Sequence, residues 1–166
     1  MTVGYATEQR APEVEVDQFR EAMARLAAPV VVVTTRYAGQ DWGMTASAVM
    51  SVSLDPPLVT VSVARTSGCH SAFVQAPEFV INILGSQHQD LARRFARSGI
   101  DRFAGGGTTT LPGTGLPVIC GAGVVLRCER WTVVAVGDHD LLVGRPTGID
   151  LAEAGSPLVW YQRSFH

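Results

Sequence analysis

The chain is expected to fold around the stretch Gly43-Met44-Thr45-Ala46-Ser47-Ala48-Val49-Met50-Ser51-Val52-Ser53-Leu54-Asp55-Pro56-Pro57. With a period of two, small hydroxyl side chains fall on one face and apolar side chains on the other: Thr45, Ser47, Ser51 and Ser53 against Ala46, Ala48, Met50, Val52 and Leu54. This alternation predicts a β-strand with one face in an apolar core. Since proline cannot donate to a sheet ladder, the strand is expected to end at the proline pair.

The hydroxyl face of this predicted strand is its unusual feature. A solvent-facing strand ordinarily carries Lys, Glu or Arg, whereas this one carries only Ser and Thr. Hydroxyl groups both donate and accept hydrogen bonds, and their small size lets a flat ligand approach the backbone. The row suits the polar, uncharged edge of a ring such as a flavin, but an edge strand that is merely rich in Ser and Thr would show the same pattern.

The segment from Gly43 to Ala48, followed by Ser51-Val52-Ser53-Leu54-Asp55-Pro56-Pro57, resembles the signature of the short-chain flavin reductase family. These proteins are the reductase components of two-component flavin-dependent monooxygenases, and the similarity extends from about Phe19 to Tyr161. The resemblance implies a mainly β fold with peripheral helices, the FMN-binding split β-barrel. It would occupy residues 17–166, after an N-terminal tail of residues 1–16. The main departure is a Gly/Thr-rich loop without an aromatic residue from Ala104 to Gly115.

Size and composition fit one globular domain. The chain has 166 residues, of which 46% are hydrophobic and 17% charged, with a formal net charge of -2. A charge this small gives no basic field, so nucleic acid is not an expected partner. No apolar run approaches the ~20 residues of a membrane helix, and the N-terminus lacks the apolar core of a signal peptide. The sequence therefore predicts neither a membrane nor a nucleic-acid partner.

The cysteines and histidines do not form a metal-binding pattern. The three cysteines Cys69, Cys120 and Cys128 include no CxxC pair, and no histidine lies at zinc-ligand spacing from them. Free thiols are typical of a reducing compartment, so a cytoplasmic location without a metal is expected.

The remaining pattern predicts alternating strands and short helices without a βαβ repeat. Helices are expected after an Asp17 cap, around residues 67–76, and after a capping box formed by Ser86 and Gln89. Further strands are expected over residues 30–35, 58–64, 79–84, 122–136, 140–144 and 157–161, the first forming a hairpin with the hydroxyl-faced strand through a turn at residues 39–43. The glycine-rich segment 105–115 is predicted to be a long mobile loop near the site.

Arg65 and Ser67 follow a predicted strand and precede a predicted helix. A cation beside exposed helix amides is a natural anion site, although an ordinary exposed Arg and a Ser cap are the alternative. The resemblance implies that this Arg-x-Ser step holds the flavin phosphate and that Ser62 faces the ribityl chain. It thus implies a flavin site that comprises Thr45, Ala46, Ser47, Ser51, Ser53, Ser62, Arg65 and Ser67.

The turn Gly137-Asp138-His139 lies between two predicted strands. A lone His in a turn is usually only solvated, but the resemblance implies that this turn lines the nicotinamide site. His139 is then a positioning group or a proton donor, since its side chain titrates near neutral pH, with Asp138 structural. Asp101-Arg102-Phe103 also resembles the family, and Arg102 would pair with the pyrophosphate or with Asp101.

The resemblance implies an NAD(P)H:flavin oxidoreductase that reduces FMN or FAD with NADH or NADPH and delivers reduced flavin to a separate monooxygenase. The glycine motifs do not continue as GxGxxG at a strand-to-helix turn, so nicotinamide binding is expected without a Rossmann domain. The resemblance also implies a homodimer. The alternative is a flavin-binding redox sensor or carrier that does not turn over NADH.

Overall fold

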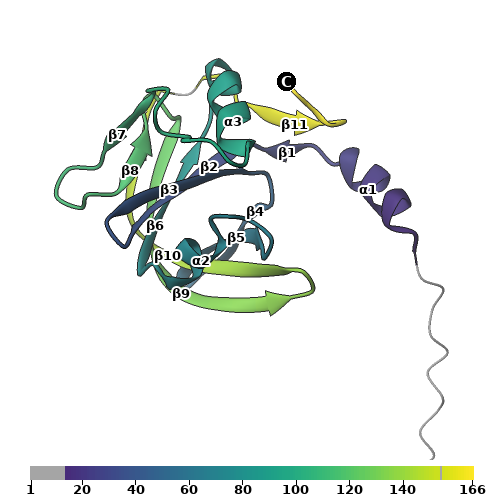
Figure 1. The fold of residues 1–166 in the computed structure, drawn as a ribbon, viewed down its shortest axis with the longest axis horizontal. Helices are drawn as coiled ribbons and strands as arrows, with labels where there is room; N and C mark the ends of the chain where they lie inside the picture. Colours follow the sequence, from purple (N-terminus) through teal and green to yellow (C-terminus); the bar gives the residue numbers. More distant parts are fainter. Residues whose placement is uncertain (1–13, 154) are drawn as a thin grey trace, which may run out of the picture.

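The structure, a computed structural model, describes residues 14–153 and 155–166. Its α-helices and one 3-10 helix are α1 (Val16–Ala24), α2 (His70–Gln75), η1 (Ser86–His88) and α3 (Gln89–Ala96). Its strands are β1 (Ala28–Pro29), β2 (Val31–Tyr37), β3 (Gln40–Ala46), β4 (Val49–Leu54), β5 (Pro57–Ala64), β6 (Glu78–Ile83), β7 (Thr108–Thr110), β8 (Pro117–Ile119), β9 (Val124–Val136), β10 (His139–Leu151), β11 (Val159–Tyr161) and β12 (Ser164–Phe165). The prediction of a mainly β fold with peripheral helices is confirmed (Figure 1).

Seven antiparallel strands form the main sheet in the order β3-β2-β6-β9-β10-β5-β4. Its two edge strands, β3 and β4, are consecutive in the chain and separated only by Ser47 and Ala48. Two residues can bridge about 11 Å, whereas the edges of a flat seven-stranded sheet lie about 29 Å apart. The sheet must therefore curl into a barrel whose edge strands meet at an unpaired seam.

The apolar core fills the inside of this curled sheet. The strand residues Val31, Val33, Val61 and Val63 are fully buried there, and Phe73 of α2 is buried in the same cluster. Val30, which precedes β2, and Val32, which lies within it, are buried on the opposite face of the sheet. The β-branched run 30–35 was predicted as a buried strand, and it is buried on both faces.

A second core lies on the outer face of the sheet, where α3 packs. Ala92 and Phe95 of α3 are buried against Val30 and Val32, and Trp160 of β11 packs against the same cluster. Figure 1 shows α3 beside β11 at the end of the barrel where β3 leads into β4. This packing fixes α3 next to the seam.

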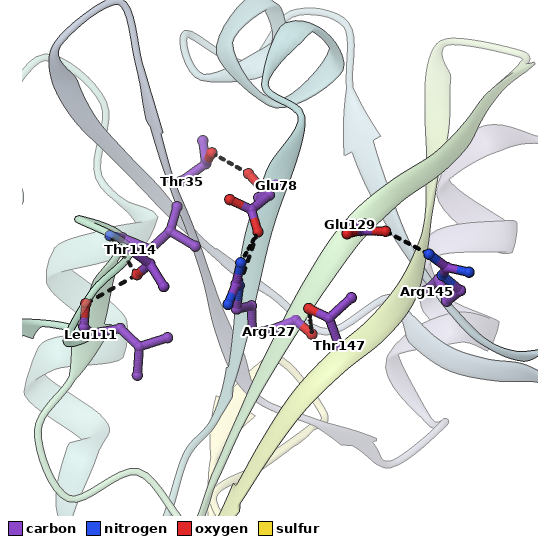
Figure 2. A network of polar contacts seen from close by, with 9 residues as sticks. Thr35, Glu78, Leu111, Thr114, Arg127, Glu129, Arg145 and Thr147 are labelled. Carbon is purple, nitrogen blue, oxygen red and sulfur yellow. Dashed lines mark hydrogen bonds and ion pairs between the residues drawn. The ribbon is translucent and has the colours of Figure 1, made fainter.

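Cross-strand ion pairs hold the neighbouring strands β6, β9 and β10 in register. Both Nε and Nη2 of Arg127 donate to Oε1 of Glu78, at 2.9 and 2.5 Å, and Arg145 Nη2 donates to Glu129 Oε2 at 2.7 Å (Figure 2). The Thr35 hydroxyl donates to the Glu78 carbonyl at 2.6 Å, which adds β2 to the same network. These pairs lie away from the seam, so their role is structural.

The predicted hydroxyl-faced strand is wrong in two respects. It is broken at Ser47 and Ala48 into β3 and β4, which lie on opposite edges of the sheet. The face predicted to be in the core is exposed on β4, where Met50, Val52 and Leu54 are 61%, 52% and 90% exposed. Alternation shows that two faces differ in polarity, but it does not show which face a curled sheet turns inward.

Two predictions of helix caps also need correction. The first helix begins at Val16, its N-cap is Glu15 without a side-chain cap, and Asp17 instead pairs with Arg20. The predicted capping box at Ser86 does not form, because that turn is a 3-10 helix in which the Gly85 N–H donates to His88 Nδ1 at 3.2 Å.

The segment 105–115 is not a structureless loop, since β7 lies within it and pairs with β8. Residues 1–13 of the predicted N-terminal tail lie outside the described residues. No helix in the described ranges combines the length and the apolar character needed to cross a bilayer.

Candidate functional site

A cavity of about 410 Å³ opens at the seam between β3 and β4. The residues at the break, from Met44 to Ala48, form one wall. The end of β5 and the following turn form a second wall with Ser62, Ala64, Thr66 and Ser67. The end of α3, the segment after it and the first residue of β10 complete the lining with Phe95, Ala96, Ser98, Arg102 and His139. The break in the sheet thus creates a concave site whose walls come from five parts of the chain.

Hydroxyl groups and backbone at the seam supply its polar surface. The Thr45 hydroxyl donates to the Ala92 carbonyl at 2.6 Å, which ties β3 to α3 and leaves its oxygen as an acceptor. The Ser62 N–H donates to the Ala48 carbonyl at 3.0 Å and holds β5 against the break. Within the described ranges, the Ser47 and Ser62 hydroxyls form no hydrogen bond, so both can serve a ligand.

His139 enters this cavity from the first position of β10. Its Nδ1 lies 2.7 Å from Asp138 Oδ1, and this hydrogen bond holds the pKa of Asp138 below its ordinary value. Because an ionised carboxylate only accepts, Nδ1 must carry the proton. The Nε2 of His139 is then the ring nitrogen that remains for a ligand.

Asp140 lies next along β10 and joins three elements. Arg65 donates from Nε and Nη2 to its Oδ1, at 3.1 and 2.8 Å, and His70 Nε2 lies 2.7 Å from its Oδ2. Arg65 is the main reason that the pKa of Asp140 lies below its ordinary value, and His70 adds to the effect. The contacts tie the turn that carries Thr66 and Ser67 to the strand that carries His139.

Arg102 is fixed between this cavity and a larger one beside it. Its Nη1 donates to the Gly43 carbonyl at 2.6 Å and to Cys69 Sγ at 2.7 Å, and its Nε donates to the Arg97 carbonyl at 2.7 Å. The neighbouring cavity, of about 610 Å³, shares Arg102 and Ser98 with the seam cavity. The predicted pairing of Arg102 with Asp101 does not form, because the Asp101 carboxylate instead accepts from the Phe103 and Ala104 N–H groups.

Most of the predicted site residues meet at the seam. The cavity brings together Thr45, Ala46, Ser47, Ser62, Ser67, Arg102 and His139. Ser51 and Ser53 lie farther along β4, and Arg65, Gly137 and Asp138 lie beside the cavity without lining it. Their assignment to flavin or nicotinamide binding stays a prediction.

Sequence reasoning placed His70 beside the phosphate site but missed its acid partner Asp140, and it also missed Ala96 and Ser98, which line the cavity. Ala96 and Ser98 come just after Phe95, the last apolar residue of the predicted helix that opens at Ser86. Their position in the sequence carries no chemical signal. Asp140 is a charged residue at the start of the predicted strand 140–144, directly before Leu141-Leu142-Val143, and that contrast was the available signal.

The described residues contain no group of three or more His, Cys, Asp or Glu side chains positioned to hold a metal ion. Cys69 and Cys128 are buried and Cys120 is exposed, all as free thiols. Burial raises the pKa of Cys128 to about 12, which makes this thiol a packing residue.

Comparison with known proteins identifies the family of this site. The model of the flavin reductase like domain matches residues 23–166. The chain belongs to the flavin reductase-like family. It is 50% identical over 157 residues to the NADH:riboflavin 5'-phosphate oxidoreductase of Streptomyces pristinaespiralis, covering 93% of this chain and 89% of that protein.

Two further relatives extend the comparison of this flavin reductase-like chain. It is 34% identical to the reductase component of 4-hydroxyphenylacetate 3-monooxygenase from Thermus thermophilus, over 90% of this chain and 94% of that one. The structure of the NADH:FAD oxidoreductase SgcE6 of Streptomyces globisporus, in complex with NAD and FAD fragments, superposes with a TM-score of 0.86 at 28% identity. That match covers 94% of this chain and 96% of the other. The predicted family and its split-barrel fold are therefore confirmed.

Proposed function

We propose that this chain is an NAD(P)H:flavin oxidoreductase that supplies reduced flavin to a separate flavin-dependent monooxygenase. The observation that carries the proposal is the seam cavity, in which unpaired hydroxyls and the Nε2 of His139 face a common space. Relatives named as NADH:flavin oxidoreductases and as a monooxygenase reductase component support the same assignment.

The flavin ring lies along the break between β3 and β4 in this proposal. The unpaired hydroxyls of Ser47 and Ser62 and the backbone at Thr45 and Ala46 are suited to its polar edge, since the groups there are small and uncharged. Ser67 and Nη1 of Arg65 are assigned to the flavin phosphate, because among the described residues the guanidinium of Arg65 donates only from Nε and Nη2, to Asp140. Ser51 and Ser53 continue the hydroxyl row on β4.

The nicotinamide is assigned to the side of the cavity that His139 and Arg102 line. The flavin, when bound, supplies the redox chemistry by accepting hydride from the reduced nicotinamide. His139 orients the nicotinamide or donates a proton from Nε2, while Asp138 fixes its tautomer and Gly137 forms the turn. Arg102 is held by three hydrogen bonds, so it presents a positive charge without having to order its side chain on binding.

We also propose that the chain forms a homodimer. Its free cysteines fit a reducing compartment, so we propose a cytoplasmic location. A set of large apolar side chains is exposed on β4, β9 and β10: Met50, Val52, Leu54, Trp131, Val134, Val136, Ile149 and Leu151. Large apolar side chains that are exposed along the run of neighbouring strands β9-β10-β5-β4 suit a protein–protein interface. The substitution Leu54→Arg is expected to convert a dimer into a monomer, measured by light scattering after gel filtration. A wild-type monomer at micromolar concentration would contradict the proposal.

Loss of NADH absorbance on mixing the purified protein with NADH and either FMN or FAD tests the function. The proposal predicts a loss that requires both protein and flavin, and the same assay with NADPH shows which nicotinamide is used. Flavin binding without NADH oxidation would overturn the proposal and favour a flavin-binding sensor or carrier.

A further inference from the structure

Asp140 on β10 connects Arg65 to His70, the first residue of α2. One oxygen of the carboxylate accepts both hydrogen bonds from Arg65, and the other lies 2.7 Å from His70 Nε2. The side chains of Asp140 and His70 are 13% and 21% exposed, whereas that of Arg65 is 44% exposed. Arg65 is therefore the member of this cluster that can meet a ligand directly, and the other two act on the ligand through it.

The contact with Asp140 determines which nitrogen of His70 can take up a proton. Asp140 is ionised at neutral pH, because Arg65 and His70 hold its pKa below its ordinary value. An ionised carboxylate only accepts, so His70 Nε2 carries a proton in both charge states of the ring. Within the described ranges, Nδ1 of His70 has no hydrogen-bond partner, so a second proton can bind there without breaking a contact.

The charge on His70 sets the net charge of the cluster. With a neutral ring, the charges of Arg65 and Asp140 cancel. With a proton on Nδ1, the cluster carries one positive charge. The imidazole and the guanidinium contact the same carboxylate, so this charge acts on a phosphate at Arg65 over a distance comparable to the screening length of about 10 Å at 0.1 M salt.

The other titratable side chains that contact α2 or form its N-cap are Tyr37, Cys69, Arg102 and Arg130. Arginine is ordinarily charged and tyrosine neutral from about pH 6.5 to about pH 8. The Cys69 thiol contacts Arg102 rather than the Asp140 carboxylate. His70 is therefore the group through which a proton near neutral pH changes the charge beside Asp140.

Asp138 and His139 lie on the other side of Asp140 in the chain. They pair with each other at 2.7 Å, and His139 lines the seam cavity where the flavin ring is assigned. FMN and riboflavin carry the same ring, so a change in the charge of His139 affects the binding of that ring in both flavins. A comparison of the two flavins isolates the effect at the phosphate.

We propose that Asp140 and His70 are positioning residues that couple phosphate binding at Arg65 to the uptake of a proton by His70. The dianionic phosphate of FMN binds more tightly to the protonated cluster, and by linkage it draws a proton onto His70 Nδ1. The affinity for FMN therefore rises relative to that for riboflavin as the pH falls from about 8 to about 6.5. The inference rests on the proposed function, from which it takes the phosphate site at Arg65 and Ser67.

The test is the ratio of the riboflavin to the FMN dissociation constant, measured by flavin fluorescence at pH 6.5 and at pH 8. The proposal predicts that this ratio is at least about threefold larger at pH 6.5. The phosphate alone would change the ratio in the opposite direction, because it loses charge as the pH approaches its own pKa of about 6.

Two histidine variants separate coupling from a structural role. His70→Gln keeps a side-chain donor for Asp140 but cannot take up a proton, so its ratio is expected not to rise at pH 6.5. His166→Gln removes an exposed histidine outside the seam cavity and is the matched control, which is expected to keep the rise of the wild type.

Calorimetry of the wild type in two buffers with different ionisation enthalpies measures the proton uptake itself. At pH 7.5, FMN binding is expected to take up a fraction of a proton more than riboflavin binding does. A phosphate that binds as the dianion can only release a proton, so a net uptake comes from the protein. This measurement does not depend on the folding of any variant.

A wild-type ratio that does not rise towards pH 6.5, or a rise that persists in His70→Gln, would overturn the coupling and leave Asp140 and His70 as structural ties between β10 and α2. A chain that reduces both flavins with NADH but shows no rise keeps the proposed function and loses only the coupling. A chain that shows the rise but oxidises no NADH keeps the coupling and loses the proposed function.

Discussion

Gly43 on β3 lies where the outer core, α3 and Arg102 meet, and a methyl group there would have no space. A Cβ atom at this position would lie 2.6 Å from Phe95 Cε1 and 3.2 Å from Phe103 Cζ. Phe95 is fully buried and packs edge to face on Phe103 with centroids 5.1 Å apart, so the Phe95 ring has no free space to move into. The substitution Gly43→Ala is therefore expected to overpack the junction of α3 with the seam.

The expected loss in the free energy of unfolding follows from the size of this clash. Forcing an extra methyl group into a well-packed core costs about 1–3 kcal/mol. For a chain of this length, about 2 kcal/mol lowers the melting temperature by about 4–8 °C. Gly68→Ala is the matched control, because a Cβ there meets no atom within 4 Å and the backbone is not left-handed.

Thermal unfolding followed by circular dichroism compares the two variants. Gly68→Ala is expected to melt within a few degrees of the wild type, since Gly→Ala at a permitted site changes stability by only about 0.4–1 kcal/mol. Equal melting temperatures for Gly43→Ala and Gly68→Ala would refute the packing assigned to α3 and the seam. The Gly43 carbonyl also holds Arg102, so Gly43→Ala is further expected to weaken nicotinamide use.

Three further substitutions test the residues around the cavity. His139→Ala is expected to slow NADH oxidation at least about tenfold while flavin affinity changes less, and equal losses in both would remove its assigned role. Arg65→Ala is expected to weaken FMN more than riboflavin in a fluorescence titration, because only FMN carries the phosphate; parallel losses would contradict the phosphate assignment. Asp140→Asn is expected to lower the melting temperature at pH 7, because it removes a carboxylate bound by Arg65 and His70. Since the folded pKa of Asp140 lies below the unfolded value of about 3.9, its stabilisation is complete above that value and is lost as the pH falls through the folded pKa. The difference between wild type and Asp140→Asn should therefore shrink below about pH 4, and a constant difference from pH 7 to pH 3 would count against the ion-pair assignment.

The residues at the seam could be predicted from the sequence because their chemistry is local. Thr45 and Ser47 stand out as hydroxyls in a strand pattern, and His139 stands out as a titratable residue in a glycine turn. Their convergence could not be predicted from periodicity alone, since it depends on which strands become the edges of the sheet. The resemblance to a family supplied that long-range information.

The apolar face of β4 was predicted to lie in the core, and the reason that it is exposed instead is physical. Met50, Val52 and Leu54 alternate as core residues would, but on this edge strand they are exposed. An apolar face that meets another chain has the same local pattern as one that meets its own core. The Asp140 contacts were not predictable either, because Arg65 and His70 are about 70 residues away in the sequence and meet it only through strand pairing.

In the proposed function, the break between β3 and β4 holds the flavin ring with one face toward His139. A crystal structure of the chain with bound FMN would show where the ring lies. The account predicts the ring within hydrogen-bonding distance of the backbone or hydroxyls at Thr45, Ala46 and Ser47, with its open face on the side of His139. A ring bound in the neighbouring cavity beside Trp42 and Ile100 would contradict this placement.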